Sequence, residues 1–515
     1  MKSLKVLLPL LALAISLAAQ PVLAHGFGER YSLPLPLSFF AIGGAAAVVF
    51  SFVMVGTVVK GESRSFNYPR FNLFRYRWLE ALLSGPALAS IEIVSVLLFL
   101  LVIATGLLGS TRPVDNLAPT FVWVIWWVGM GFFIALFGNL WALVNPWKVL
   151  FSWVESLYQM LWPEQELDLG YQYPQDWGIW PAVALFFTFA WVETSFIESA
   201  NPRTLAWLII IYSLITLGGM FIFGNHQWLR RGEIFSVVFG FLSRFSITEV
   251  RVNDAGVCRE CSSGHCRNED RTCIDCYECF EYSKDREFNL RPPAIGLNNS
   301  RALTPSVVAM VMLLLASVTF DGFSATVEWL QVQSFFITQF PTLTSEFVNG
   351  VTIANTLGLI GFPLAFAGLY WFFSRLMYRM VGNQPPSVPV LMGAFVFTLI
   401  PIALAYNYAH FLSFLLIQGQ QIIALVSDPF GYGWDLFGTA DYLIDVQIIS
   451  ARFIWFFSVG VIVVGHIIAV YLAHLRAMRI YTDQTLAMKS QIPMLGLMVL
   501  YTVVSLWIVS RPITQ

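Results

Sequence analysis

The sequence predicts an all-α integral membrane protein with about ten transmembrane helices and a small cysteine-rich cytoplasmic insert that binds metal. Hydrophobic residues make up 57% of the 515 residues and charged residues only 12%, whereas soluble domains carry about 25% charged residues. Apolar stretches long enough to cross a hydrocarbon core recur along the chain. The formal net charge of −2 gives no basic surface for nucleic acid, so the bilayer is the expected partner.

The first element, residues 1–24, has the pattern of a cleaved secretory signal peptide. Lys2 and Lys5 form a basic segment, a short apolar stretch follows, and small residues precede a cut after Ala24. An uncleaved anchor helix is the alternative. Cleavage would make His25 the first residue of the mature protein, on the periplasmic side of a bacterial inner membrane.

The rest of the chain divides into a first helical half (25–245), the cysteine-rich insert (246–303) and a second helical half (304–515). The predicted spans are 37–59, 86–109, 119–143, 178–197, 204–224, 304–322, 351–374, 387–413, 448–474 and 493–510. The apolar segment 232–245 is too short to span, and we predict an interfacial or re-entrant helix there.

The positions of Lys and Arg predict the orientation of these spans. With the mature N-terminus outside, most basic residues fall in inner loops, including eleven arginines and lysines in the long central loop. The outer side has only Arg30, Arg112, Arg203 and Arg511, with Arg452 near the outer end of the ninth span. This asymmetry follows the positive-inside rule and places the insert in the cytoplasm.

All six cysteines lie in one short segment of the insert. They are Cys258, Cys261, Cys266, Cys273, Cys276 and Cys279, with His265 among them. Closely spaced C-x-x-C pairs in a reducing compartment favour a metal site over disulfides. The set 258, 261, 273 and 276 has zinc-ribbon spacing, and the run from 273 to 279 is similar to three ligands of a four-iron cluster. Zinc, an iron–sulfur cluster, or disulfides on an outer loop all remain open here, and zinc that staples a small domain is the leading interpretation.

Ionisable residues within spans are costly to bury and often functional. Glu193, Asp321 and His410 are expected near the outer ends of their helices, on the side that His25 reaches. Imidazole nitrogen and carboxylate oxygen ligands suit Zn²⁺ or Cu²⁺, so His25, Asp321 and His410 are candidate metal ligands. The alternative for each residue is a buried polar group that a neighbouring helix satisfies.

Several stretches give the chain a family resemblance. "HGFGERYSLPLPL", "TFDGFSAT", "YAHFLSFLLIQGQ", "SDPFGYGWDLFGT" and "GHIIAVYLAH" together resemble bacterial multi-spanning proteins known as fenitrothion hydrolases. The resemblance implies hydrolysis of an organophosphorus ester. That chemistry needs an activated water and a polarised phosphoryl oxygen, both of which a metal ion supplies. The resemblance then implies that Asp321 and Glu193 are the catalytic carboxylates and that Glu193 is the candidate base. The sequence contains neither G-x-S-x-G nor H-E-x-x-H.

A transporter of a metal ion or small solute is the second hypothesis. Glu92, His466 and His474 would then continue a polar path inward from His410. His466 and His474 are eight residues apart, so they share one helical face. A redox or assembly component, whose cysteine domain docks a cytoplasmic partner, is a third. Ionisable groups gathered at one depth would favour a catalytic site, whereas groups at several depths would favour transport.

Overall fold

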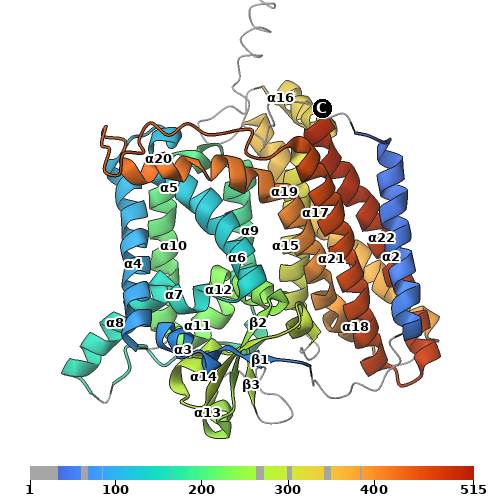
Figure 1. Cartoon of the computed structure of the whole chain (residues 1–515), viewed down its shortest axis with the longest axis horizontal. Helices are drawn as coiled ribbons and strands as arrows, with labels where there is room; N and C mark the ends of the chain where they lie inside the picture. Colours follow the sequence, from blue (N-terminus) through green and yellow to red (C-terminus); the bar gives the residue numbers. More distant parts are fainter. Residues whose placement is uncertain are drawn as a thin grey trace, which may run out of the picture.

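A computed structural model gives the fold of most of the chain. It describes residues 33–58, 68–83, 85–163, 165–261, 272–298, 304–341, 349–382 and 386–514. Within these ranges, nine helices are long and apolar enough to cross a membrane. The helices stand side by side, with a small sheet against one side of the bundle (Figure 1). The predicted all-α membrane architecture is therefore confirmed. The predicted signal peptide, His25, His265 and Cys266 lie outside the described residues.

Each predicted span from the sequence corresponds to a helix. The spanning helices are α2 (Leu37–Val58), α4 (Gly85–Leu108), the continuous α5 (Leu117–Pro119), η3 (Thr120–Met130) and α6 (Gly131–Phe137), α10 (Pro202–Phe223), α15 (Pro305–Ser324), α17 (Gly350–Met380), α18 (Val388–Phe395) with η8 (Val396–Leu399) and α19 (Ile400–Gln418), α21 (Ala451–Ile480) and α22 (Gln484–Thr514). The tenth prediction, 178–197, forms α9 (Trp180–Ser195), which at 16 residues is shorter than the other nine.

Shorter elements connect the spans. The helices are α3 (Arg77–Leu82), α7 (Trp141–Val144), α8 (Pro146–Leu161), α11 (Asn225–Arg231), α12 (Ile234–Leu242), α13 (Ala255–Glu260), α14 (Tyr277–Tyr282), α16 (Val327–Gln339) and α20 (Gln421–Ser427). The start of α2 and the end of α22 lie on the same side of the bundle, together with α16 and α20 (Figure 1). We call this the far side, and the side that carries the β-strands the sheet side. Helix α2 packs against α21 and α22, so the first span belongs in space to the second half.

Helix α12 inserts among the spanning helices from the sheet side. Its residues Ile234, Phe235 and Phe239 are buried, and Phe235 lies against aromatic rings of η3, α9 and α10. Glu233 caps the buried N-terminus, because its carboxylate accepts hydrogen bonds from the N–H groups of Phe235 (2.9 Å) and Ser236 (2.7 Å). With two of its first N–H groups satisfied in this way, a short helix can begin inside the bundle. Whether α12 is interfacial or re-entrant stays a prediction.

Four short antiparallel strands form the sheet beneath the bundle, in the order β1 (Phe71–Asn72), β4 (Arg286–Leu290), β2 (Thr248–Val252) and β3 (Cys273–Ile274). Strand β1 comes from the loop between the first two spans, so the insert is completed by residues far from 246–303. The sheet is fastened to the end of α6. The N–H of Ile247 donates to the carbonyl of Leu136 (3.0 Å), and the Thr248 hydroxyl donates to that of Phe137 (2.6 Å).

Gly138 makes this junction possible. Its φ of +116° is in a region that favours glycine, and a Cβ there would overlap the Thr248 hydroxyl. We expect Gly138→Ala to lower the free energy of unfolding by about 1–3 kcal/mol, measured by thermal unfolding in detergent. Gly131→Ala is the matched control, because Gly131 is helical and nothing lies within 4 Å of its Cβ position. Equal stability of the two variants would contradict the assigned role of Gly138.

Candidate functional site

Three of the predicted site residues converge in the part of the bundle nearer the far side. Asp321 of α15 and His410 of α19 are in contact, with 2.8 Å between Asp321 Oδ2 and His410 Nε2. Glu193 of α9 accepts a hydrogen bond from Trp127 Nε1 (2.9 Å), which projects from the π-helical η3. Glu193 and Asp321 line the same cavity, together with Asn407. Helices from both halves of the chain therefore bring these ionisable side chains together.

The cavity beside Asp321 is small. Its volume is about 60 Å³, which is enough for a few water molecules or an ion but much smaller than a typical ligand site of about 300–1,000 Å³. Among the described residues, groups of three or more potential metal ligands close together occur only in the cysteine cluster. The proposed metal site therefore depends on His25, outside the described residues, and stays a prediction.

Two buried tyrosines extend this cluster toward the middle of the bundle. The Tyr406 ring stacks against His410, with 6.1 Å between ring centroids, and Tyr406 lies within electrostatic range of Asp321 and Tyr501. The Tyr501 hydroxyl shares a 2.5 Å hydrogen bond with Thr319. The Tyr406 hydroxyl is buried, and no described residue forms a hydrogen bond with it. Sequence analysis missed both tyrosines, because tyrosine is common in membrane proteins and carries no spacing signal.

His466 and His474 continue the same line on α21. Both are buried, and His466 lies 5.9 Å from the Tyr501 ring, centroid to centroid. Its Nδ1 contacts the carbonyl of Ile462 (2.8 Å), while its Nε2 is buried without a hydrogen-bond partner among the described residues. Nearer the sheet side, His474 Nδ1 lies 3.3 Å from Gln491 Oε1. Acidic, aromatic and imidazole side chains thus occupy several depths between α15, α19, α21 and α22. We call this set the polar file; its members are Asp321, His410, Tyr406, Tyr501, His466 and His474.

Glu92 does not belong to the polar file. It lies on α4, which packs mainly against α10, and it is within electrostatic range of Lys148 and Glu281. Lys148 forms an ion pair with Glu281, so this group fastens the cysteine insert to the end of the membrane bundle. The structure therefore places His410, His466 and His474 on the packed helices α19 and α21, and Glu92 apart from them on α4.

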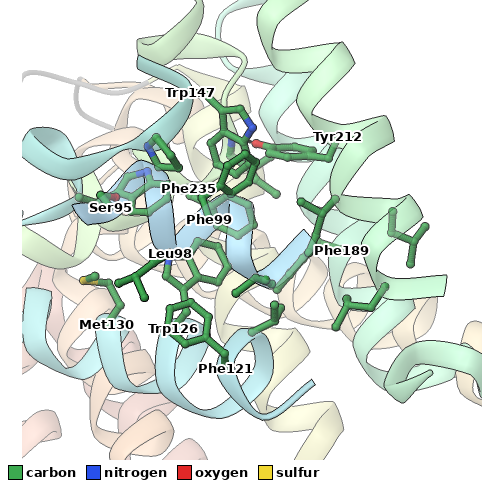
Figure 2. Close-up of a pocket in the computed structure, with 18 of the residues that line it drawn as sticks. Ser95, Leu98, Phe99, Phe121, Trp126, Met130, Trp147, Phe189, Tyr212 and Phe235 are labelled. Atoms are coloured by element: carbon green, nitrogen blue, oxygen red, sulfur yellow. Dashed lines mark hydrogen bonds between the residues drawn. The ribbon is translucent and has the colours of Figure 1, made fainter. Parts of the chain in front are cut away.

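A larger cavity lies elsewhere, among α4, η3, α9, α10 and α12, and has a volume of about 420 Å³ (Figure 2). Aromatic and aliphatic side chains line it, and no carboxylate or imidazole is among the lining residues. Three of its polar side chains are already hydrogen-bonded, whereas Trp141 Nε1 is buried without a partner among the described residues. The Tyr212 hydroxyl donates to Glu233 (2.6 Å), Trp147 Nε1 to Ser213 (2.8 Å) and the Ser95 hydroxyl to the carbonyl of Val144 (2.5 Å). This cavity suits an apolar occupant and offers no acid–base chemistry.

The cysteine cluster lies on the sheet side, where α13, β3 and α14 meet. Its five described cysteines form two groups of three that share one member, namely Cys258, Cys273 and Cys279, and Cys261, Cys276 and Cys279. The ligand atoms within each group lie within 4.8 Å of one another, so the insert is suited to bind metal. This grouping differs from the predicted ribbon set of 258, 261, 273 and 276, because Cys279 belongs to both groups.

Local backbone and charge both support the cluster. Asp275 adopts a φ of +54°, which turns the chain between Cys273 and Cys276. Arg230 of α11 points its Nη2 at Cys261 Sγ and Cys276 Sγ, 3.5 Å from each, and pairs with Glu278. Burial alone would lower the pKa of Arg230, but the two sulfurs and Glu278 raise it above its ordinary value. A permanent cation therefore faces the thiols.

Comparison with protein-family models, with curated proteins and with solved structures found no match to this chain. The interpretation of the site accordingly depends on its own geometry.

Proposed function

We propose that this protein is a membrane transporter that moves protons, alone or coupled to another small cation, along the polar file. The observation that carries the proposal is the sequence of titratable groups from Asp321 and His410, past Tyr406 and Tyr501, to His466. Chains of acidic and imidazole groups inside a helical bundle are typical of proton relays. Because these groups occupy successive depths, they suit transfer across the membrane better than chemistry at one point.

Two unpartnered polar atoms support the relay. The Tyr406 hydroxyl and His466 Nε2 are buried, both residues lie near Tyr501, and neither atom has a hydrogen-bond partner among the described residues. Buried polar atoms are rarely left without a partner, and water or an ion is the usual missing group. A water at each position would connect the Asp321–His410 pair to His466.

The proposal is tested with purified protein in vesicles that contain a pH-sensitive dye. A potassium gradient with valinomycin sets the membrane potential, and the initial rate of internal pH change is measured. We expect Asp321→Asn to reduce the rate roughly tenfold or more, because an amide side chain neither binds nor releases a proton at the pH of the assay. Glu92→Gln is the matched control, since Glu92 is an intramembrane carboxylate outside the polar file. Wild-type flux no greater than that of empty vesicles, or an unchanged Asp321→Asn rate, would overturn the proposal.

A hydrolase is the second candidate, and the convergence of Glu193, Asp321 and His410 near one depth favours it. On that proposal, which the resemblance to fenitrothion hydrolases suggests, Asp321 and His410 bind a zinc or copper ion together with His25, and Glu193 accepts the proton of the attacking water. The 60 Å³ volume beside Asp321 argues against it, because an organophosphorus ester is too large for such a cavity. Ester hydrolysis that Asp321→Asn abolishes, in a protein without proton flux, would favour this candidate over the relay.

The orientation that goes with either function follows from the charge distribution. Basic residues such as Arg230, Arg291 and Lys148 lie with the insert on the sheet side. We propose that this side faces the bacterial cytoplasm and that the far side, with the cavity at Asp321, faces the periplasm. Zinc is the proposed metal of the insert, since tetrahedral thiolate sites in small domains usually hold it.

A further inference from the structure

The distances between the cysteine sulfurs define the kind of metal centre that fits the insert. Cys261 Sγ and Cys276 Sγ are 3.7 Å apart, and so are Cys273 Sγ and Cys279 Sγ. A tetrahedral ion with metal–sulfur bonds of about 2.3 Å holds its sulfurs about 3.8 Å apart. In a four-iron cluster each cysteine binds its own iron, so the sulfurs stand farther from one another. The observed spacing therefore fits a metal centre in which the two sulfurs of each pair bind the same ion.

The way the cysteines are divided points to more than one ion. Each C-x-x-C pair contributes one sulfur to each group: Cys258 and Cys261 separate, and so do Cys273 and Cys276. A mononuclear ribbon would instead use both sulfurs of each pair on the same ion. Only Cys279 lies in both groups. We propose that the insert binds two divalent ions, each held by three cysteine sulfurs, with the Cys279 thiolate bridging them and a water or other donor completing each tetrahedron.

The charge of the cluster favours two ions over one. Cys258, Cys273, Cys276 and Cys279 are all buried, so thiolates there need compensation. Two divalent ions leave a single excess negative charge on the five thiolates, and the Arg230 guanidinium faces that charge. A single ion leaves three excess charges, or three thiols that keep their protons. On binding two ions, the five thiols release their protons to solvent.

The wild-type protein provides the first test. Full-length protein from cells grown with added zinc should be purified in detergent. Elemental mass spectrometry should then find two equivalents of zinc per chain. X-ray absorption at the zinc edge should show sulfur neighbours and, in addition, a zinc–zinc distance. One equivalent of zinc without a zinc–zinc distance would overturn the proposal, and so would iron with acid-labile sulfide. Neither measurement depends on transport, so the result is independent of the proposed function.

Two cysteine variants separate the shared ligand from a ligand of one ion. Cys258→Ser should lose about one of the two equivalents, because Cys258 belongs to one group only. Cys279→Ser should lose both ions, because Cys279 belongs to both groups. Ser283→Ala is the control, since Ser283 is buried beside the cluster but outside both groups and should keep two equivalents. Equal losses in Cys258→Ser and Cys279→Ser would contradict the bridge. If the variants do not fold, the X-ray absorption spectrum of the wild-type protein decides between one and two ions by the presence or absence of a zinc–zinc distance.

Discussion

Replacing Arg291 with methionine should lower the free energy of unfolding by about 3–5 kcal/mol, because breaking a buried ion pair leaves an uncompensated charge. The Arg291 side chain is fully buried and contacts Asp275 Oδ2 (2.7 Å) and Glu249 Oε2 (3.5 Å). It also donates to the carbonyls of Ser243 (3.2 Å) and Ser246 (3.3 Å), which follow α12. A single guanidinium thus connects the segment after α12, strand β2 and the turn at Asp275 between Cys273 and Cys276. Thermal and denaturant unfolding in detergent measure the loss.

The pH dependence of this variant has a definite sign. Burial already raises the pKa of Asp275 in the folded protein, and Arg291 opposes that rise. Without the arginine, the folded-state pKa of Asp275 moves further above its unfolded value. At pH values between these two pKa values, the folded state binds more protons than the unfolded state. Relative to a Lys284→Met control, the stability of Arg291→Met should therefore increase as the pH falls through the raised pKa of Asp275. Lys284→Met is the control, because Lys284 is exposed. A variant as stable as this control, or less stable at low pH, would contradict the assigned role.

The spans were predictable because each depends on local composition. A hydrocarbon core about 30 Å thick demands some 20 apolar residues, and that requirement is visible in any window of the sequence. Glu193, Asp321 and His410 could likewise be placed at similar depths from their positions in the spans. Strand β1 could not be predicted, since a two-residue strand has no periodicity and forms only by pairing with β4.

The site was less predictable because its contacts join distant helices. His466 and His474 share a helical face whatever surrounds them, and this was foreseen. Tyr406 and Tyr501 join the polar file only because α19 and α22 pack against α15 and α21. Cysteine spacing identified a metal-binding segment, but spacing alone cannot tell which sulfurs share an ion. Glu92 was included in the predicted path only because it is an ionisable residue within a span. In the structure, it lies within electrostatic range of Lys148.

His466 is the position where interrupting the polar file should have the largest effect on transport. It is the buried imidazole between Tyr501 and the sheet-side half of α21, and phenylalanine would fill its place without a group that exchanges protons. On the proposed function, we expect His466→Phe to reduce proton flux in vesicles roughly tenfold or more, while leaving the Asp321–His410 contact intact. Tyr471→Phe is the matched control on the same helix, because Tyr471 is exposed on the outer surface of the bundle. Flux that His466→Phe leaves at the wild-type rate, while Asp321→Asn abolishes it, would show that protons cross from Asp321 to the sheet side without His466. His466 would then be a buried packing residue of α21 and not a member of the relay.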